Sequence, residues 1–89
     1  MLELERSNVF KRDIKQVRSQ GKKFDLLNEV VNLLLNQESL PLRYCNHKLT
    51  GNYNGYMELH IQPDWLLIYK IDHKILFLAR TGSHSDLFA

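Results

Sequence analysis

The hydrophobic and polar residues of the first third of the chain follow two different periods. Residues 2–5 read Leu-Glu-Leu-Glu, an alternation that predicts a short strand with one buried face. From Ser7 onward the period is helical, with apolar side chains at Phe10, Ile14 and Val17. Ser7 can cap this first helix and Gly21 is available to end it.

A second, more buried helix is predicted over residues 24–36. Its apolar positions form a wide stripe: Phe24, Leu26, Leu27, Val30, Val31, Leu33 and Leu34. The periodicity ends at residues 37–41, and residues 49–55 are rich in turn formers. A connection this long is uncommon in a small domain, and its apolar residues argue against disorder. We therefore expect an ordered loop that carries His47 to a functional site.

Three short apolar runs occupy residues 56–88, and the last two share a tight turn. If Asp72 and His73 form a two-residue hairpin loop, counting back along both strands places Trp65 opposite Arg80. The register therefore predicts that Trp65 and Arg80 are direct cross-strand neighbours.

The turn at residues 63–64 decides which side chains share a face. A loop of two or four residues leaves one open face with the residues Tyr56, Glu58, His60, Trp65, Tyr69 and Arg80. The other face is apolar and would carry the helices: Met57, Leu59, Ile61, Leu66, Ile68, Ile75, Phe77 and Ala79. We predict an α+β fold in β-α-α-β-β-β order, an antiparallel sheet with two N-terminal helices packed on one face.

Composition narrows the class of protein. Eighty-nine residues with 44% hydrophobic content predict a single domain over residues 1–89. There is no apolar run of about 20 residues and no signal-peptide pattern, so we expect a cytoplasmic protein with no membrane partner. The single Cys45 excludes an internal disulfide.

Charge is distributed unevenly along the chain. Residues 1–23 carry seven basic and three acidic side chains, a net charge of +4, and the remainder carries five against seven, a net charge of −2. A cationic helix face could meet phosphates or an acidic protein, although a solvated face without a partner is equally common.

Candidate chemistry gathers where the strands end. The residues concerned are His47, His60, Asp64, Trp65, Arg80 and His84. Histidine transfers protons near neutral pH, arginine holds phosphate, and an exposed aromatic ring stacks on a nucleobase. RNA cleavage needs only these parts, because the 2′-hydroxyl of the substrate is the nucleophile. Each residue also has an ordinary structural interpretation: Trp65 in a core, Arg80 over an aromatic ring, Asp64 in a turn.

Two motifs in the second half of the chain resemble those of a known family. Residues 60–65 fit H-x-x-P-D-W and residues 80–88 fit R-T-G-S-H-x-x-L-F, and residues 46–51 (Asn-His-Lys-Leu-Thr-Gly) add to the match. Over about residues 44–88 the chain closely resembles the YafQ-type toxins of the RelE/ParE superfamily of bacterial toxin-antitoxin systems.

The resemblance implies a ribosome-dependent mRNA endonuclease that is held inactive by an antitoxin encoded beside it, as a monomeric toxin within a hetero-oligomer. It implies catalytic roles for His47, His60, Asp64, Arg80 and His84, and RNA contacts for Lys48, Trp65 and Phe88. We expect His47, Asp64 and His84 to handle protons while His60 and Arg80 hold phosphate. The basic first helix would then face ribosomal RNA or the antitoxin.

Two other classes of function stay open at this point. Metal-assisted hydrolysis could use the histidines with Asp64, although their spacing matches no ligand signature, and we expect neither metal nor cofactor. A non-enzymatic interaction protein, like the gyrase-poisoning branch of the same superfamily, would not need the acid-base set.

Overall fold

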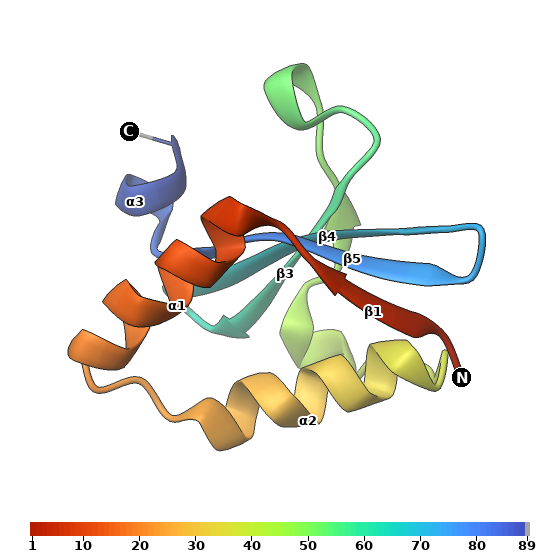
Figure 1. Cartoon of the computed structure of the whole chain (residues 1–89), viewed down its shortest axis with the longest axis horizontal. Coiled ribbons are helices and arrows are strands. Elements are labelled where there is room, and N and C mark those ends of the chain that lie inside the picture. Colours follow the sequence, from red (N-terminus) through yellow and green to blue (C-terminus); the bar gives the residue numbers. More distant parts are fainter. Residues whose placement is uncertain (89) are drawn as a thin grey trace.

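A five-stranded mixed sheet forms the centre of the computed structural model, which describes residues 1–88 (Figure 1). The strands are β1 (Glu3–Arg6), β2 (His47–Lys48), β3 (Met57–Gln62), β4 (Trp65–Asp72) and β5 (Ile75–Gly82), in the spatial order β1-β5-β4-β3-β2. β1 pairs with β5 in parallel and the other pairs are antiparallel. The expectation of a purely antiparallel sheet was wrong, because β1 lies beside β5 at the end of the sheet and the two strands run in the same direction.

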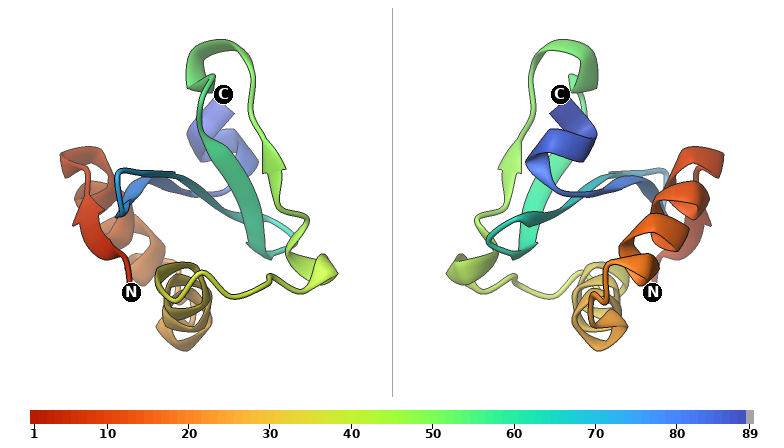
Figure 2. Two further views of the ribbon diagram at one scale, coloured as in Figure 1. Left: turned by 90° about the vertical axis from the view of Figure 1, so that its right-hand side faces the viewer. Right: turned by 90° about the vertical axis from the view of Figure 1, so that its left-hand side faces the viewer.

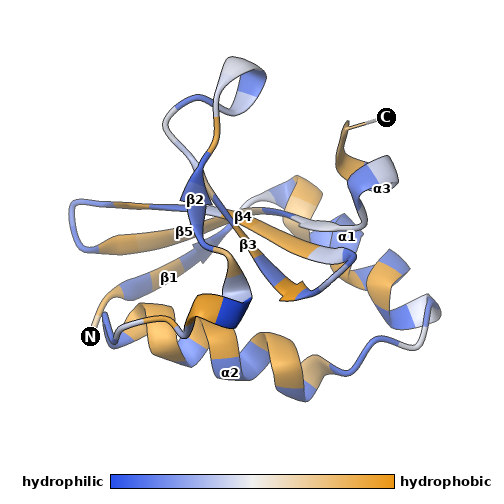
Figure 3. Ribbon diagram, turned by 180° about the vertical axis from the view of Figure 1, so that it is seen from behind, coloured by the Kyte–Doolittle hydropathy of each residue, from blue (hydrophilic) through white to orange (hydrophobic). Residues whose placement is uncertain are grey.

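Two helices, α1 (Asn8–Ser19) and α2 (Phe24–Leu35), cover one face of this sheet, as predicted (Figure 2). Ser7 caps α1, since its Oγ accepts a hydrogen bond of 2.9 Å from the Phe10 N–H. Phe10 and Val17 of α1 join Leu27, Val30 and Leu34 of α2 in the main core. Apolar residues run along α2 (Figure 3).

The long connection after α2 is ordered, as expected. It holds two short 3₁₀ turns, η1 (Leu42–Tyr44) and η2 (Gly51–Tyr53), on either side of β2. In β2, His47 pairs with Glu58 of β3. The connection therefore carries His47 to the edge of the sheet.

The β4–β5 hairpin turns one residue later than predicted. Asp72 pairs with Ile75, so that His73 and Lys74 form the two-residue loop, with φ angles of 48° and 65°. Positive φ at both positions is the requirement of a type I′ turn, whose twist matches that of the flanking strands.

Two β-bulges change which side chains share a face. Ile61 in β3 and Ala79 in β5 each have no partner of their own, so the register shifts by one residue at each place. Because of the later turn and the bulge at Ala79 together, Arg80 pairs with Ile68, and the predicted pairing of Trp65 with Arg80 is wrong. Trp65 faces the helices instead.

The side chain of Trp65 is fully buried in the main core. Its Nε1–H donates to Thr81 Oγ1 at 2.9 Å, and the Thr81 hydroxyl donates to the Leu66 carbonyl at 2.7 Å. The prediction that Trp65 gives RNA a surface for stacking is therefore wrong. The residues Leu67 and Tyr69 face the helices as well, which corrects the predicted place of Tyr69 on the open face.

The face opposite the helices carries a small core of its own. Leu66, Ile68 and Ala79, which we expected under the helices, are buried there with Leu87. A third helix, α3 (His84–Phe88), packs over this second core. Figure 2 shows α3 on the side of the sheet away from α2. No helix in residues 1–88 is long and apolar enough to cross a membrane.

Candidate active site

Three histidines from separate elements lie next to one another in the order His47, His60, His84, and together they form the histidine line. The His47 and His60 rings are 6.3 Å apart, and the His60 and His84 rings 5.8 Å, between centroids. β2, β3 and the start of α3 supply one each. The structure thus brings these three candidate residues together, with His60 in the middle.

Glu58 lies between the first two histidines and has no role in the sequence-based interpretation. Its Oε1 is 3.2 Å from Nε2 of His47 and 3.6 Å from Nε2 of His60. The Glu58 side chain is only 5% exposed, whereas the His47 side chain is 49% exposed. The alternation of β3 places Glu58 on the same face as His60, which is a signal that the sequence does contain.

In His47 and in His60, the hydrogen bond made by Nδ1 fixes the tautomer of the ring. Nδ1 of His47 lies 2.7 Å from the Cys45 carbonyl, and Nδ1 of His60 lies 3.2 Å from the Pro63 carbonyl. A carbonyl only accepts, so both Nδ1 atoms must carry hydrogen. In a neutral ring Nε2 would then be a bare acceptor facing a carboxylate oxygen, which is also an acceptor. The His47–Glu58–His60 group therefore needs an additional proton to bridge these atoms.

His84 and Asp64 form a second acid-base pair at the other end of the line. The His84 backbone N–H donates to Asp64 Oδ1 at 3.2 Å, and His84 Nδ1 lies 3.5 Å from the same oxygen. The backbone hydrogen bond lowers the pKa of Asp64, and the His84 imidazole adds to this effect. Within residues 1–88 no side chain or backbone group bonds the remaining His84 nitrogen, Nε2, which leaves that atom able to exchange a proton with a substrate.

The local sequence explains why His84 starts a helix. The Asp86 N–H donates to Ser83 Oγ and the Ser83 N–H donates to Asp86 Oδ2, a reciprocal cap. Gly82 has a φ of 155°, and a Cβ there would come within 3.3 Å of the Asp86 side chain. The sequence-based interpretation missed α3, although Ser83 and Asp86 have the spacing of a capping box.

The guanidinium of Arg80 is hydrogen-bonded to the buried carboxylate of Asp13. Its Nε and Nη2 donate to Asp13 of α1 at 2.8 and 3.1 Å, and Nη1 donates to the Tyr53 hydroxyl at 3.4 Å. The Thr81 N–H also donates to Asp13, at 3.1 Å. The hydrogen bonds to Asp13 raise the pKa of Arg80. This geometry fits a residue that locks α1 onto β5 better than one that holds phosphate.

Asp13 could have been found from the sequence. It lies on the buried stripe of α1, three residues after Phe10 and four before Val17, and is 8% exposed. A carboxylate on a buried face needs a partner, since an unpaired buried charge is costly.

The remaining two candidate residues lie at the surface. Phe88 is 46% exposed, and its ring lies 6.0 Å from His84 and 5.9 Å from Tyr53. Lys48 is exposed and follows His47 in β2. Both could contact a substrate that approaches the histidines.

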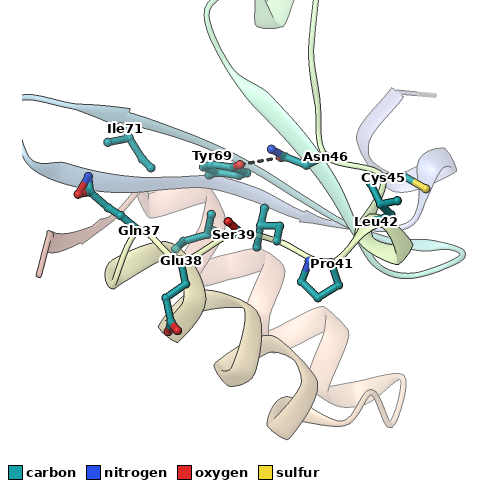
Figure 4. Close-up of a pocket in the computed structure, with 11 residues that line it drawn as sticks. Gln37, Glu38, Ser39, Pro41, Leu42, Cys45, Asn46, Tyr69 and Ile71 are labelled. Atoms are coloured by element: carbon teal, nitrogen blue, oxygen red, sulfur yellow. Dashed lines mark hydrogen bonds between the residues drawn. The ribbon is translucent and has the colours of Figure 1, made fainter.

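Two cavities flank the segment that carries His47. One of about 640 Å³ lies beside His60, with Cys45 and Arg43 at its border. The other, of about 590 Å³, lies between this segment and the sheet (Figure 4). There the Tyr69 hydroxyl donates to Asn46 Oδ1 at 2.6 Å, a contact that anchors the residue before His47 to β4.

The described residues include no group of three or more His, Cys, Asp or Glu side chains arranged to hold a metal ion.

Comparisons with known proteins agree with one another. The family model for the bacterial toxin of type II toxin-antitoxin system, YafQ, matches residues 2–89. The mRNA interferase toxin YafQ of Escherichia coli K12 is 38% identical over 87 residues, 97% of this chain and 95% of that protein. In a crystal structure of the E. coli DinJ-YafQ complex, a chain 37% identical superimposes with a TM-score of 0.91, with 100% of both chains covered. A metal-bound toxin from Helicobacter pylori, 40% identical, has a TM-score of 0.92 over 99% of this chain and 100% of its own. This chain therefore belongs to the YafQ family of bacterial toxins from type II toxin-antitoxin systems.

Proposed function

We propose that this chain is an endoribonuclease toxin that cleaves mRNA on the ribosome by metal-independent acid-base catalysis. The observation that carries the proposal is the line of three histidines with a carboxylate paired to each end, Glu58 at His47 and Asp64 at His84. Its relative from E. coli is named as an mRNA interferase.

The reaction needs two proton transfers and no protein nucleophile. A base removes the proton of the 2′-hydroxyl, and the 2′ oxygen forms a bond to the neighbouring phosphorus. The bond from phosphorus to the 5′ oxygen breaks, and an acid protonates that oxygen. The products are a 2′,3′-cyclic phosphate and a free 5′-hydroxyl, so atoms and charges balance without a co-reactant.

The residues divide these two transfers between them. His84, oriented by Asp64, carries one at its unbonded Nε2. The His47–Glu58–His60 group carries the other, since it shares a proton among three side chains. Arg80 acts as a positioning residue through Asp13 and Tyr53.

The antitoxin is the second partner in this proposal. The E. coli relative is found in complex with DinJ, and the toxin family is defined by such systems. An antitoxin that covers the histidine line would prevent both proton transfers, which provides a simple route to inactivation.

Substitution of His84 tests the proposal, with His73 as a matched control. His73 lies in the β4–β5 loop with its side chain 89% exposed, so His73→Ala removes the same group outside the site. We expect growth arrest and mRNA cleavage from the native chain and from His73→Ala, and neither from His84→Ala. If all three proteins arrest growth equally and leave mRNA intact, the endonuclease is the wrong function, and arrested replication would favour a gyrase-poisoning toxin.

A further inference from the structure

A row of three side chains crosses the sheet beside the candidate active site, on the face away from α1 and α2. Lys70 of β4 pairs with Phe77 of β5, and Tyr56 lies on the other side of Lys70, because Met57 pairs with Tyr69. The Lys70 ammonium is 4.9 Å from the centre of the Tyr56 ring and 5.8 Å from that of Phe77. All three members of this Tyr56–Lys70–Phe77 row are partly exposed.

Aromatic rings connect the row to the histidines without a break. Phe88 lies 6.0 Å from His84, Tyr53 lies 5.9 Å from Phe88, and Tyr56 lies 6.1 Å from Tyr53, between ring centroids. The last two contacts are edge-to-face. An extended ligand that reaches from the histidine line to Lys70 therefore passes Phe88, Tyr53 and Tyr56 in turn.

The row borders a cavity of about 330 Å³. This volume lies within the range of small-ligand sites. Glu5 and Asp72 also line the cavity, but within residues 1–88 no carboxylate lies within ion-pair distance of the Lys70 ammonium. A second hollow of about 350 Å³ lies on the other side of Tyr56 and is bordered by Lys48. Tyr56 thus has a lysine and a hollow on each side.

Spacing along the strands places the Tyr56–Lys70–Phe77 row next to the row that contains Glu58. Glu58, Ile68 and Arg80 are paired across β3, β4 and β5 and form the row next to it. Side chains two positions apart on a strand are about 7 Å apart. A ligand of repeating units that has one unit at the histidines that contact Glu58 would place a neighbouring unit at the Tyr56 end of the row.

We propose that the Tyr56–Lys70–Phe77 row binds a nucleotide of single-stranded RNA that flanks the cleaved phosphodiester. The base packs against the exposed faces of Tyr56 and Phe77, and the phosphate pairs with the Lys70 ammonium. Every nucleobase has a π-face, so this contact adds affinity with little sequence preference. The inference rests on the proposed function, which supplies the RNA.

Cleavage of ribosome-bound mRNA at increasing toxin concentration tests the row. Lys70→Gln and Phe77→Leu should each raise the half-saturating concentration by about tenfold, the loss typical of one base contact, and leave the maximal rate within about twofold. Lys74→Gln removes the same charge from the hairpin loop and should change neither value. Equal behaviour of Lys70→Gln and Lys74→Gln would overturn the proposal. Lys70→Gln removes no apolar core contact, so it decides the matter even if Phe77→Leu folds poorly.

A modified substrate identifies the nucleotide. mRNAs with one abasic position on either side of the cleavage site are compared with the native chain and with Phe77→Leu. At one flanking position, the abasic substrate should weaken the native chain as much as Phe77→Leu does, and the two changes together should cost no more than either alone. Independent losses at every position would contradict the proposal.

The failures of the two proposals can be told apart. A native chain that cleaves no ribosome-bound mRNA would overturn both the proposed function and this inference. A native chain that cleaves normally while the row variants match Lys74→Gln overturns the inference alone. Row variants that cleave normally but escape the antitoxin would assign the row to protein recognition and would also overturn it.

Discussion

Glu58 is the residue on which the protonation of the site depends. Its buried carboxylate faces Nε2 of His47 and His60, while both Nδ1 atoms donate to backbone carbonyls. A glutamine in its place has one amide N–H₂ that can donate to a bare Nε2, so the additional proton is no longer required.

Glu58→Gln should therefore change the protonation of the histidines without loss of fold. We expect nitrogen NMR spectra of the native chain and of the variant to differ at the His47 and His60 rings, because Nε2 then faces a donor in place of an acceptor. Cleavage should fall by about 100-fold, the size of a typical general acid-base contribution. Unchanged ring spectra would contradict a shared proton.

Asp64 makes the stability of the folded chain depend on pH in the acid range. Because the pKa of Asp64 is lowered from 3.8 in the folded chain, the folded state is favoured by the ionised carboxylate above that value. This contribution is lost as the pH falls through the folded pKa. We expect urea midpoints of the native chain and of Asp64→Asn to differ more at pH 7 than at pH 3. A difference that is the same at both pH values would mean that the bond from His84 N–H does not depend on the charge.

At the scale of elements, the contact between Asp13 and Arg80 joins α1 to β5. Removal of one partner leaves the other charge poorly paired in a mostly buried place. Asp13→Asn should lower the free energy of unfolding by about 2–4 kcal/mol, somewhat less than for a fully buried pair. Asp25→Asn, an exposed change in the first turn of α2, should cost well under 1 kcal/mol. Equal unfolding midpoints for the two variants in urea would show that the pair contributes little.

The two β-bulges make a prediction about Trp65 that one fluorescence experiment can check. It is the single tryptophan of the chain, so its emission reports on one site. Full burial against α1 and α2 predicts blue-shifted emission that neither acrylamide nor added RNA quenches strongly. Strong quenching by RNA would restore the stacking role that the sequence suggested.

The same strands show which features of the fold could be predicted from the sequence and which could not. The helices were predictable because Phe10, Val17, Leu27 and Leu34 repeat at helical spacing, and the face of β3 was predictable from its alternation. The faces of β4 were not, because nothing in the composition of the strands marks Ile61 as a bulge. One additional residue there reverses the face of every side chain that follows.

The candidate site was predictable in its residue types and only partly in its geometry. The histidines and Asp64 come together as expected, since they lie at strand ends or in the connection that reaches β3. Trp65 and Arg80 do not, because the bulge in β3 places Trp65 in the core and Asp13 holds the Arg80 guanidinium.

At the scale of the whole molecule, the basic residues and the proposed catalytic histidines lie on different elements. The first 23 residues carry a net charge of +4, mostly on α1, whereas the histidine line lies at β2, β3 and α3. With a net charge of only +2 over the whole chain, strong binding of free RNA is not expected. In our proposal the ribosome presents the mRNA, and the basic helix is available to ribosomal RNA or to the antitoxin.

Lys11→Gln combined with Lys15→Gln tests this division. The two exposed lysines lie on α1, which supplies none of the three histidines. The double variant should need more toxin for half-maximal cleavage and show a weaker dependence on salt, while its maximal rate is retained. A lower maximal rate with an unchanged salt dependence would place α1 in the chemistry instead.

The central claim is that the 2′-hydroxyl of the mRNA is the nucleophile and that the chain supplies only proton transfers. The most direct measurement uses ribosome-bound mRNA with a single 2′-deoxynucleotide on the 5′ side of the cleaved bond. We predict rapid cleavage of the all-ribose mRNA to a 2′,3′-cyclic phosphate and a 5′-hydroxyl, and no cleavage at the deoxy position. Cleavage at the deoxy position, or products with a 5′-phosphate, would contradict the mechanism.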